Sequence, residues 1–160
     1  GSHASLVVSI NDVFYVTDVG FGDLPLHAIP ITSSEHTQPI TDISGTFRAI
    51  FNNEDKDIFY VQKFENDHWH TKYEAEFKPK QIEDFNSNIE YNQTHPDSIF
   101  VQHLLITMPQ SFGRATMSEN HLTLTRNGSS EKFDVTKDNY KHFLEKYFGL
   151  NVTINRIEKQ

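Results

Sequence analysis

The sequence contains no cysteine, and this absence excludes three kinds of chemistry. A chain of 160 residues without Cys has no disulfide, no thiolate metal site and no cysteine nucleophile of its own. It also lacks any apolar run near the roughly 18 residues of a membrane span, and no charged segment followed by an apolar stretch suggests a signal peptide. We therefore expect a cytoplasmic protein with no membrane partner.

Basic residues are few, with 14 Lys and Arg against 22 Asp and Glu and a formal charge of −8. A general nucleic-acid binder usually carries a basic face, so we expect no nucleic-acid partner, although a local basic pocket for a phosphorylated cofactor is compatible with this charge. Apolar residues are plentiful, because Val, Leu, Ile and Phe make 44 of the 160 residues. That share exceeds the roughly 20% below which chains tend to stay disordered, so we expect a packed core, and the length of 160 residues suits one domain or two small ones.

The first half of the chain has the pattern of an antiparallel sheet. Residues 6–10 and 13–16 are rich in β-branched and aromatic residues and flank Asn11-Asp12, which favours a turn. A two-residue turn here predicts a hairpin whose paired residue numbers sum to 23. Three aromatic-rich runs follow, at residues 46–51, 58–64 and 68–77. Strands that repeat about every 10–12 residues, with turn residues between them, indicate an antiparallel β-barrel or meander.

The second half has a mixed pattern. We expect a helix over residues 82–89 and another over 138–148, the latter capped by Thr136 and ended by Gly149. The expected strands are residues 98–107, 115–118, 121–126, 132–135 and 151–156. The fold class is therefore α+β, mainly β, with a β-barrel domain over residues 1–92 and a small α/β domain, an antiparallel sheet with a helix, over residues 93–160.

The register of the first hairpin brings two polar side chains together. Ser5 faces Asp18, and His3 lies on the same sheet face one diagonal away, within reach of a long side chain. An Asp that holds a His by one ring nitrogen fixes the tautomer of a general base. Because Gly1-Ser2-His3 is also what a cleaved expression tag leaves behind, the origin of His3 stays open at this point.

Two other patterns carry less information. His68 and His70 flank Trp69 and could form half of a metal site, but no third ligand is near in sequence. We favour two solvent-facing histidines around a core Trp, and we expect no metal. The stretch Gly20-Phe21-Gly22 is too short for a dinucleotide fingerprint, so its glycines either turn a corner or let backbone amides approach a ligand.

The stretch LVVSINDVFYVTDVGFGDLP, residues 6–25, resembles the arylamine N-acetyltransferases, which are acetyl-CoA-dependent enzymes with a Cys-His-Asp triad. Asp18 opens the D-V/A-G-F-G motif of that family, and His3 precedes it by a separation found in several members. The likeness continues in SGTFRA (residues 44–49), HWHTKYEAEF (68–77) and EDFNSNIEYNQTHPDSIF (83–100). Ala75 stands where the family usually has Phe, and Ile89 where it has Asn.

One departure from the family is decisive for chemistry. The family's nucleophile lies in an R-G-G-x-C-x-E/Q-N motif on an N-terminal helical domain, and this chain has neither the Cys nor the motif. It resembles a fragment of a papain-like cysteine acyltransferase fold, made of the β-barrel and the C-terminal α/β lid. The resemblance implies that the missing helical domain is a partner and that the cut edge of the barrel exposes apolar surface.

The resemblance also implies a mechanism. In the family, a thiolate attacks acetyl-CoA and an arylamine or hydrazine then attacks the acetyl-Cys, a ping-pong reaction of xenobiotic metabolism. Carried onto this chain, Asp18 orients the imidazole and His3, if native, is the base. We expect the chain alone to be inactive, because it supplies no thiolate.

The resemblance assigns four further residues. Gly20 and Gly22 would let their loop pack closely beside the thiol, and Phe21 would line the acceptor pocket. Thr94 matches a position near the CoA entrance, where its hydroxyl could donate to a phosphate; a turn residue before Pro96 is the alternative. Two other interpretations stay open: a non-catalytic β-barrel module that binds a ligand or partner, and a degenerate paralogue that lost catalysis.

Overall fold

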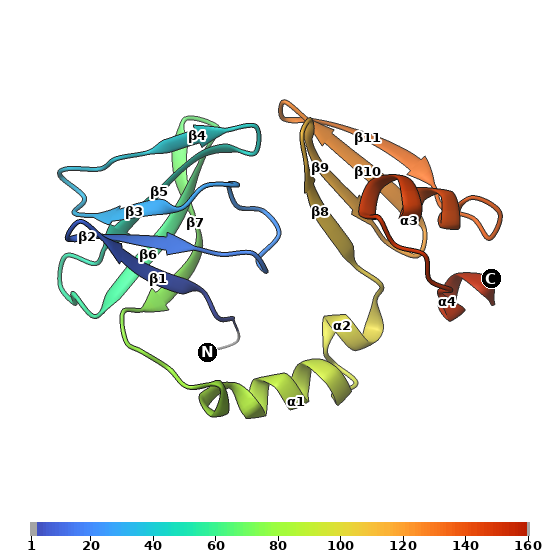
Figure 1. Ribbon diagram of the computed structural model, residues 1–160, viewed down its shortest axis with the longest axis horizontal. Coiled ribbons are helices and arrows are strands. Elements are labelled where there is room, and N and C mark those ends of the chain that lie inside the picture. The colour runs from blue at the N-terminus through green and yellow to red at the C-terminus, as the bar shows by residue number, and fades with distance from the viewer. Residues whose placement is uncertain (1–2, 160) are drawn as a thin grey trace. The chain divides into compact units, whose positions relative to one another are not determined.

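The computed structural model describes residues 3–159 and divides into two compact units, Gly1–Asp84 (unit 1) and Phe85–Gln160 (unit 2) (Figure 1). The division falls between Asp84 and Phe85, whereas the sequence pattern placed it at residue 92, inside α1 (Asn86–Thr94). Among residues 3–159, no helix is long and apolar enough to cross a membrane.

Unit 1 is a seven-stranded sheet with the order β1-β2-β3-β5-β6-β7, and β4 pairs with β5 beside this path. Its strands are β1 (Leu6–Ile10), β2 (Val13–Thr17), β3 (Ile29–Thr32), β4 (Ile40–Asp42), β5 (Gly45–Phe51), β6 (Ile58–Glu65) and β7 (His68–Glu76). The mainly β class is confirmed. Two details differ from the expected barrel: β3 and β5 are parallel, and within the described residues no pairing joins β7 to β1, so the sheet curls without closing.

The first hairpin has the predicted register. Ile10 pairs with Val13, and the pairing continues outward to Leu6 and Thr17. Asn11 and Asp12 both have positive φ, 50° and 63°, which is the geometry of a two-residue turn that matches the twist of the strands. All five residues of β1 are exposed, so this mainly apolar edge strand is partly open to solvent on both faces.

The core of unit 1 lies on one face of the sheet. Alternation along β5 and β6 turns Phe47, Ala49, Phe59 and Val61 inward, each at most 1% exposed. The prediction that Trp69 belongs to this core is wrong, because the residue lies outside the buried cluster. The Arg48 guanidinium lies 4.3 Å from the centroid of its ring. Val61 of β6 pairs with Tyr73 but Gln62 pairs with Thr71, so β7 contains one extra residue, a β-bulge. Beyond this bulge the opposite set of β7 side chains faces the core, and for this reason Tyr73 packs there whereas Trp69 does not.

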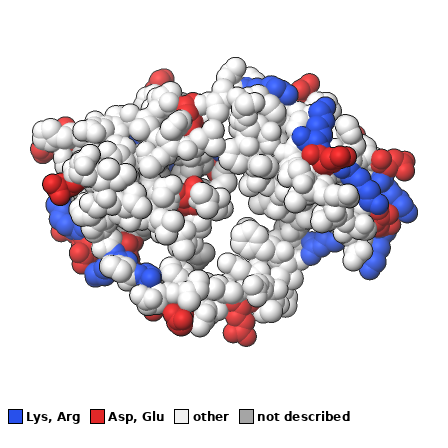
Figure 2. Space-filling model, viewed as in Figure 1, with Lys and Arg blue, Asp and Glu red and all other residues white. Residues whose placement is uncertain are grey.

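Unit 2 is a four-stranded antiparallel sheet with the order β11-β10-β9-β8. Its strands are β8 (Ile106–Gln110), β9 (Gly113–Met117), β10 (His121–Arg126) and β11 (Ser129–Asp134). The helix α3 (Tyr140–Phe148) buries Tyr140, Leu144 and Phe148 in the same core as Met117 and Leu122. Figure 2 shows Lys and Arg interspersed with Asp and Glu on the face of this unit that it presents.

The sequence predicted the C-terminal end of α3 correctly but not its N-terminal cap. Gly149 ends the helix at φ 64°, in the left-handed region that glycine adopts without strain, as predicted. Thr136 does not cap the helix. Asn139 precedes it instead, and the Asn139 Oδ1 atom accepts a hydrogen bond from the Thr136 amide at 2.8 Å.

Two expected strands of unit 2 are wrong. The strand expected at residues 98–107 begins instead with α2 (Ile99–Gln102), where Phe100 is 58% exposed, and only its last two residues belong to β8. Residues 151–156 lead into α4 (Asn155–Glu158), which buries Ile157 completely. Arg156 of α4 donates hydrogen bonds to the carbonyl groups of Val101 and Gln102 in α2. These bonds connect the two short helices. The helix expected at residues 82–89 is a 3₁₀ turn, η1 (Ile82–Phe85), followed by α1.

Candidate functional site

The strongest candidate site is a His–Asp pair directly after β2. His3 Nε2 lies 2.5 Å from Asp18 Oδ2, and the Asp18 side chain is only 2% exposed while that of His3 is 31% exposed. When Nε2–H donates to the carboxylate, Nδ1 is the ring nitrogen that carries the lone pair. The geometry therefore presents a histidine with a fixed tautomer and an available base.

A local turn aims the Asp18 carboxylate inward. Its Oδ1 atom accepts hydrogen bonds from the backbone N–H groups of Gly20 at 2.9 Å and Phe21 at 3.0 Å, as Asp does when it caps its own turn. Oδ2 is thereby directed to His3. Gly22 has φ 93°, where an L side chain is strained. Gly20 has no such need, because an added Cβ would lie 3.5 Å from His3 Cε1, an ordinary contact.

Two aromatic rings enclose the imidazole. Phe21 meets His3 edge-on at 5.5 Å between centroids, and Tyr73 lies 5.7 Å from His3 and 5.2 Å from Phe21. The Tyr73 hydroxyl is buried, close to the side chains of Ser5 and Asp18. Burial, together with the charge of Asp18, raises the pKa of Tyr73 well above its ordinary value, so the phenol stays neutral.

The space beside Asp18 within unit 1 is small. A cavity of about 10 Å³, roughly the volume that one water molecule needs, is lined by Val16, Asp18, Leu24, Pro25, His27, Ile29 and Tyr73. An aromatic amine does not fit in it. The expected role of Phe21 in an acceptor pocket therefore stays a prediction.

Comparison with known proteins decides the family. The N-acetyltransferase family model matches residues 1–157. This chain belongs to the arylamine N-acetyltransferase family. The resemblance of the Asp18–Gly22 motif therefore extends over nearly the whole sequence.

Solved arylamine N-acetyltransferases share the fold. The enzyme from Mycobacterium abscessus has a TM-score of 0.81 at 18% identity, over 98% of this chain and 57% of that one. The enzyme from Salmonella typhimurium has a TM-score of 0.79 at 24% identity, over 97% and 56%. A curated relative, the uncharacterized acetyltransferase YvcN of Bacillus subtilis, is 26% identical over 92% of this chain and 58% of its own length. The chain thus spans little more than half the length of these relatives.

The remaining residues that the arylamine N-acetyltransferase resemblance or the sequence singled out lie elsewhere. Thr94 ends α1 in unit 2, and its hydroxyl donates to the Glu90 carbonyl at 2.8 Å, so its role toward a CoA phosphate stays a prediction. His68 Nδ1 and His70 Nε2 each contact a backbone carbonyl, at 2.8 and 3.1 Å. Within residues 3–159, no group of three or more His, Asp or Glu side chains is placed to hold a metal ion.

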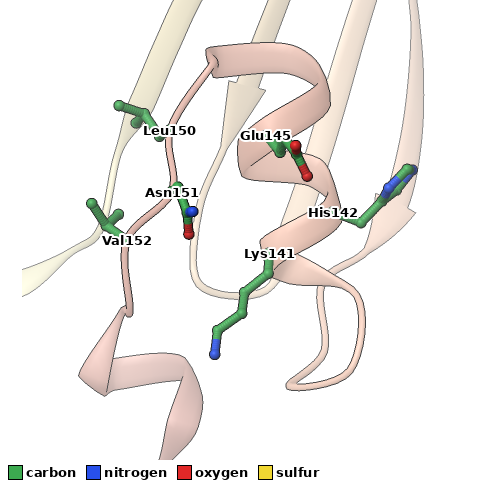
Figure 3. Close-up of a pocket in the computed structure, with 6 residues that line it drawn as sticks. All are labelled: Lys141, His142, Glu145, Leu150, Asn151 and Val152. Atoms are coloured by element: carbon green, nitrogen blue, oxygen red, sulfur yellow. The ribbon is translucent and has the colours of Figure 1, made fainter.

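Unit 2 has a larger, open pocket of about 240 Å³ (Figure 3). It is lined by Lys141, His142, Glu145, Leu150, Asn151 and Val152. Lys141 already pairs with Glu158, its Nζ lying 3.3 Å from a carboxylate oxygen. The site residues that the arylamine N-acetyltransferase motif predicts, His3 and Asp18 above all, do not line this pocket.

Proposed function

We propose that this chain carries the His–Asp half of an acetyl-transfer site, which uses acetyl-CoA as donor and an arylamine or hydrazine as acceptor. The observation that carries the proposal is the Asp18 carboxylate, which is buried with one oxygen on two loop amides and the other on His3. Family membership supports the reaction class. A related structure from Mycobacterium marinum is described in complex with CoA, which supports the donor.

The proposed chemistry uses His3 as the proton carrier. Nδ1 takes the proton of a cysteine thiol, and the thiolate attacks the thioester carbonyl of acetyl-CoA. The bond between the acetyl carbon and the CoA sulfur breaks, and the imidazolium returns the proton to the departing CoA thiolate. The amine then attacks the acetyl-cysteine, and its proton passes through His3 to the released thiolate. Asp18 orients the ring and stabilises the imidazolium throughout.

The nucleophile would come from a helical domain outside these 160 residues, since the chain has no Cys. The exposed hairpin of unit 1 supports this partner. Leu6 is 67% exposed, Ile10 55% and Phe14 41%, which is a large apolar area for one hairpin to leave in water. Phe21 would line the acceptor pocket that this domain completes, and Thr94 would contact the CoA phosphates.

Arylamine acetylation tests the proposed reaction. The purified 160-residue chain should not acetylate p-anisidine from acetyl-CoA, whereas the protein translated from the complete reading frame, with an R-G-G-x-C motif, should. In that protein Asp18→Asn should lower kcat/KM on the order of 10⁴-fold, because the His tautomer is no longer held. Robust acetylation by the 160-residue chain would refute the proposal. A start codon near residue 1 would instead favour the non-catalytic binding module.

A further inference from the structure

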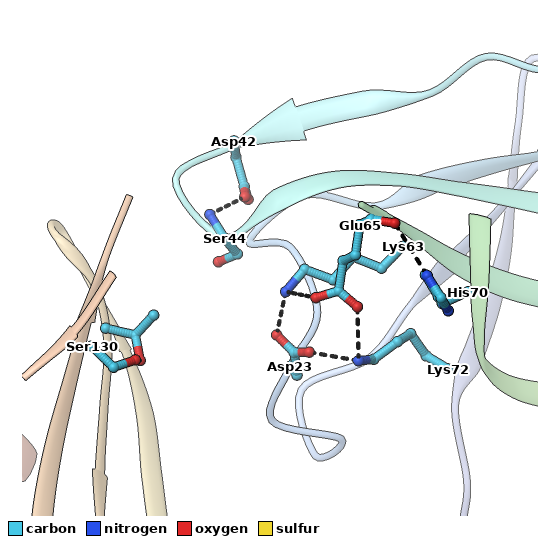
Figure 4. Close-up of polar contacts among 9 residues, drawn as sticks. Asp23, Asp42, Ser44, Lys63, Glu65, His70, Lys72 and Ser130 are labelled. Atoms are coloured by element: carbon cyan, nitrogen blue, oxygen red, sulfur yellow. Dashed lines mark hydrogen bonds and ion pairs between the residues drawn. The ribbon is translucent and has the colours of Figure 1, made fainter. Parts of the chain in front are cut away.

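Four charged side chains form a closed network beside the loop that follows Asp18 (Figure 4). Lys63 Nζ lies 2.9 Å from Asp23 Oδ1 and 3.2 Å from Glu65 Oε1. Lys72 Nζ lies 2.7 Å from Asp23 Oδ2 and 4.0 Å from Glu65 Oε2. Each ammonium group thus bridges the same two carboxylates, and both oxygens of Asp23 are engaged.

The two lysines of this network are unusually well covered. The side chain of Lys63 is 14% exposed and that of Lys72 is 21% exposed, although Lys normally keeps its ammonium group in water. Burial raises the pKa of Asp23, but the hydrogen bonds from Lys72 and Lys63 outweigh it and hold the pKa below its ordinary value. The carboxylates of Asp23 and Glu65 are 39% and 40% exposed, so these ion pairs add little to stability, and their main effect is to hold Asp23 in one position.

A β-bulge places Lys72 in this network. Val61 of β6 pairs with Tyr73, but the next residue, Gln62, pairs with Thr71, so Lys72 is the extra residue of β7. Strict alternation would turn Lys72 to the face opposite Tyr73. The bulge re-aims the side chain, and it reaches Asp23 near the inner face. The same irregularity of β7 thus turns Tyr73 toward the core and brings Lys72 to Asp23.

The aspartate belongs to the loop that carries the His–Asp pair. Residues 18–28 connect β2 to β3, and side chains from elsewhere in unit 1 hold them at two points. Lys63 and Lys72 hold Asp23, and Asp42 Oδ2 accepts a hydrogen bond from the Leu26 amide at 2.6 Å. The first residues of this loop form the turn in which the Gly20 and Phe21 amides donate hydrogen bonds to Asp18.

We propose that Lys63 and Lys72 are positioning residues for Asp18. Their ion pairs with Asp23 fix the loop, so that the Gly20 and Phe21 amides keep donating to Asp18 Oδ1 and Asp18 Oδ2 stays hydrogen-bonded to His3. Without these ion pairs, the turn at residues 18–21 opens and the His3 imidazole loses its fixed tautomer. The inference rests on the proposed function for the role of the His–Asp pair, but it concerns residues far from the D-V-G-F-G motif in sequence.

Nitrogen-15 NMR of the His3 ring in the intact 160-residue chain tests the inference at a pH where the ring is neutral. In the wild type, the two ring nitrogens should report the Nε2–H tautomer. Lys72→Met and Asp23→Asn should both move the two resonances toward the values of Asp18→Asn, which marks the unheld ring. Lys72→Arg should restore most of the wild-type spectrum, because it keeps a cation in place. Asp23→Asn is nearly isosteric and leaves both lysines, so it remains informative if Lys72→Met folds poorly.

Lys80→Met is the matched control. Lys80 Nζ lies 2.7 Å from Glu76 Oε2, the same distance as in the Lys72–Asp23 pair, but its side chain is 41% exposed. Its loss should leave the His3 resonances unchanged. Wild-type His3 resonances in both Lys72→Met and Asp23→Asn, with a clear shift in Asp18→Asn, would overturn the positioning role and leave the proposed function intact. If Asp18→Asn itself caused no shift, the proposed function would fail and this inference with it.

Discussion

Both units have an apolar core, and unit 1 in addition covers charged side chains around the loop after β2. In unit 1, Asp18 is 2% exposed, Asp42 7% and Lys63 14%, and these groups fix a loop through hydrogen bonds and ion pairs. In unit 2, the buried cluster is apolar from Ala115 to Ile157. Apolar packing tolerates substitutions that keep volume, whereas buried polar groups require particular partners in particular positions. The His–Asp geometry of unit 1 therefore depends on particular hydrogen-bond partners, which the apolar core of unit 2 does not need.

The largest effect on stability is expected from the apolar core of unit 2. Leu144 is completely buried, so Leu144→Ala removes its contacts and leaves a cavity, at a cost of about 2–5 kcal/mol. Hydrogen exchange of unit 2 amides measures this loss. The interactions of His3 and Asp18 described above are all within unit 1, so the His3 spectrum should not change.

Leu150→Ala is the control for that substitution. Leu150 is 38% exposed, and its truncation should alter stability by less than about 0.5 kcal/mol. Equal losses from Leu144→Ala and Leu150→Ala would contradict the assignment of the unit 2 core.

A backbone position in unit 2 should give the next largest effect. A Cβ on Gly113 would lie 2.2 Å from the Thr125 carbonyl oxygen, and the residue has φ 136°. Gly113→Ala should therefore cost about 1–3 kcal/mol through overpacking of β9 against β10. Gly128 has φ 77° and no atom within 4 Å of an added Cβ, so Gly128→Ala should cost less. Thermal unfolding of the two variants tests the order, and the reverse order would show that crowding at Gly113 is relieved by a small shift.

Local signals explain what the sequence predicted correctly. Asn11 and Asp12 form the turn that sets the hairpin register, and that register brings the segments of His3 and Asp18 to the same end of the hairpin. Gly149 ends α3 for the same kind of local reason. Such features depend on the conformational preferences of one or two residues, and they are visible in any short window of sequence.

Contacts distant in sequence explain what it missed. The β-branched and aromatic residues of α2 favour a strand, but the Ser98 hydroxyl bonds the Asn92 carbonyl and Arg156 holds the last carbonyls of the helix. The bulge that aims Lys72 inward leaves no mark on the composition of β7. The candidate site was therefore predictable at Asp18, where the signal is local, and not at the lysines that hold its loop.

Acid should weaken unit 1 through Asp23. Its folded pKa lies below the ordinary 3.8, so its contribution to stability is complete above that value and is lost as the pH falls through the folded pKa. The Asp23 side chain is 39% exposed, so the contribution is at most about 1 kcal/mol. Urea unfolding of unit 1 from pH 5 to pH 2, followed by its own amide signals, measures the loss. Asp23→Asn should be less stable at pH 5 and should flatten the decline, and a parallel decline in both proteins would assign it to other carboxylates.

The smallest effect compares one cation–π pair in each unit. The Arg48 guanidinium lies 4.3 Å from the Trp69 ring centroid in unit 1, and that of Arg126 lies 3.9 Å from the Phe112 centroid in unit 2. Trp attracts a cation more strongly than Phe, so a double-mutant cycle should give about 0.5 kcal/mol or somewhat more for the first pair and less for the second. Arg48→Met with Trp69→Leu, and Arg126→Met with Phe112→Leu, are the matched cycles. The Arg48 Nε atom also donates to Gln62 at 2.7 Å, and this bond cancels in the cycle because both Arg48→Met variants lack it. A larger coupling for the Phe112 pair would mean that proximity, rather than the aromatic ring, decides the energy.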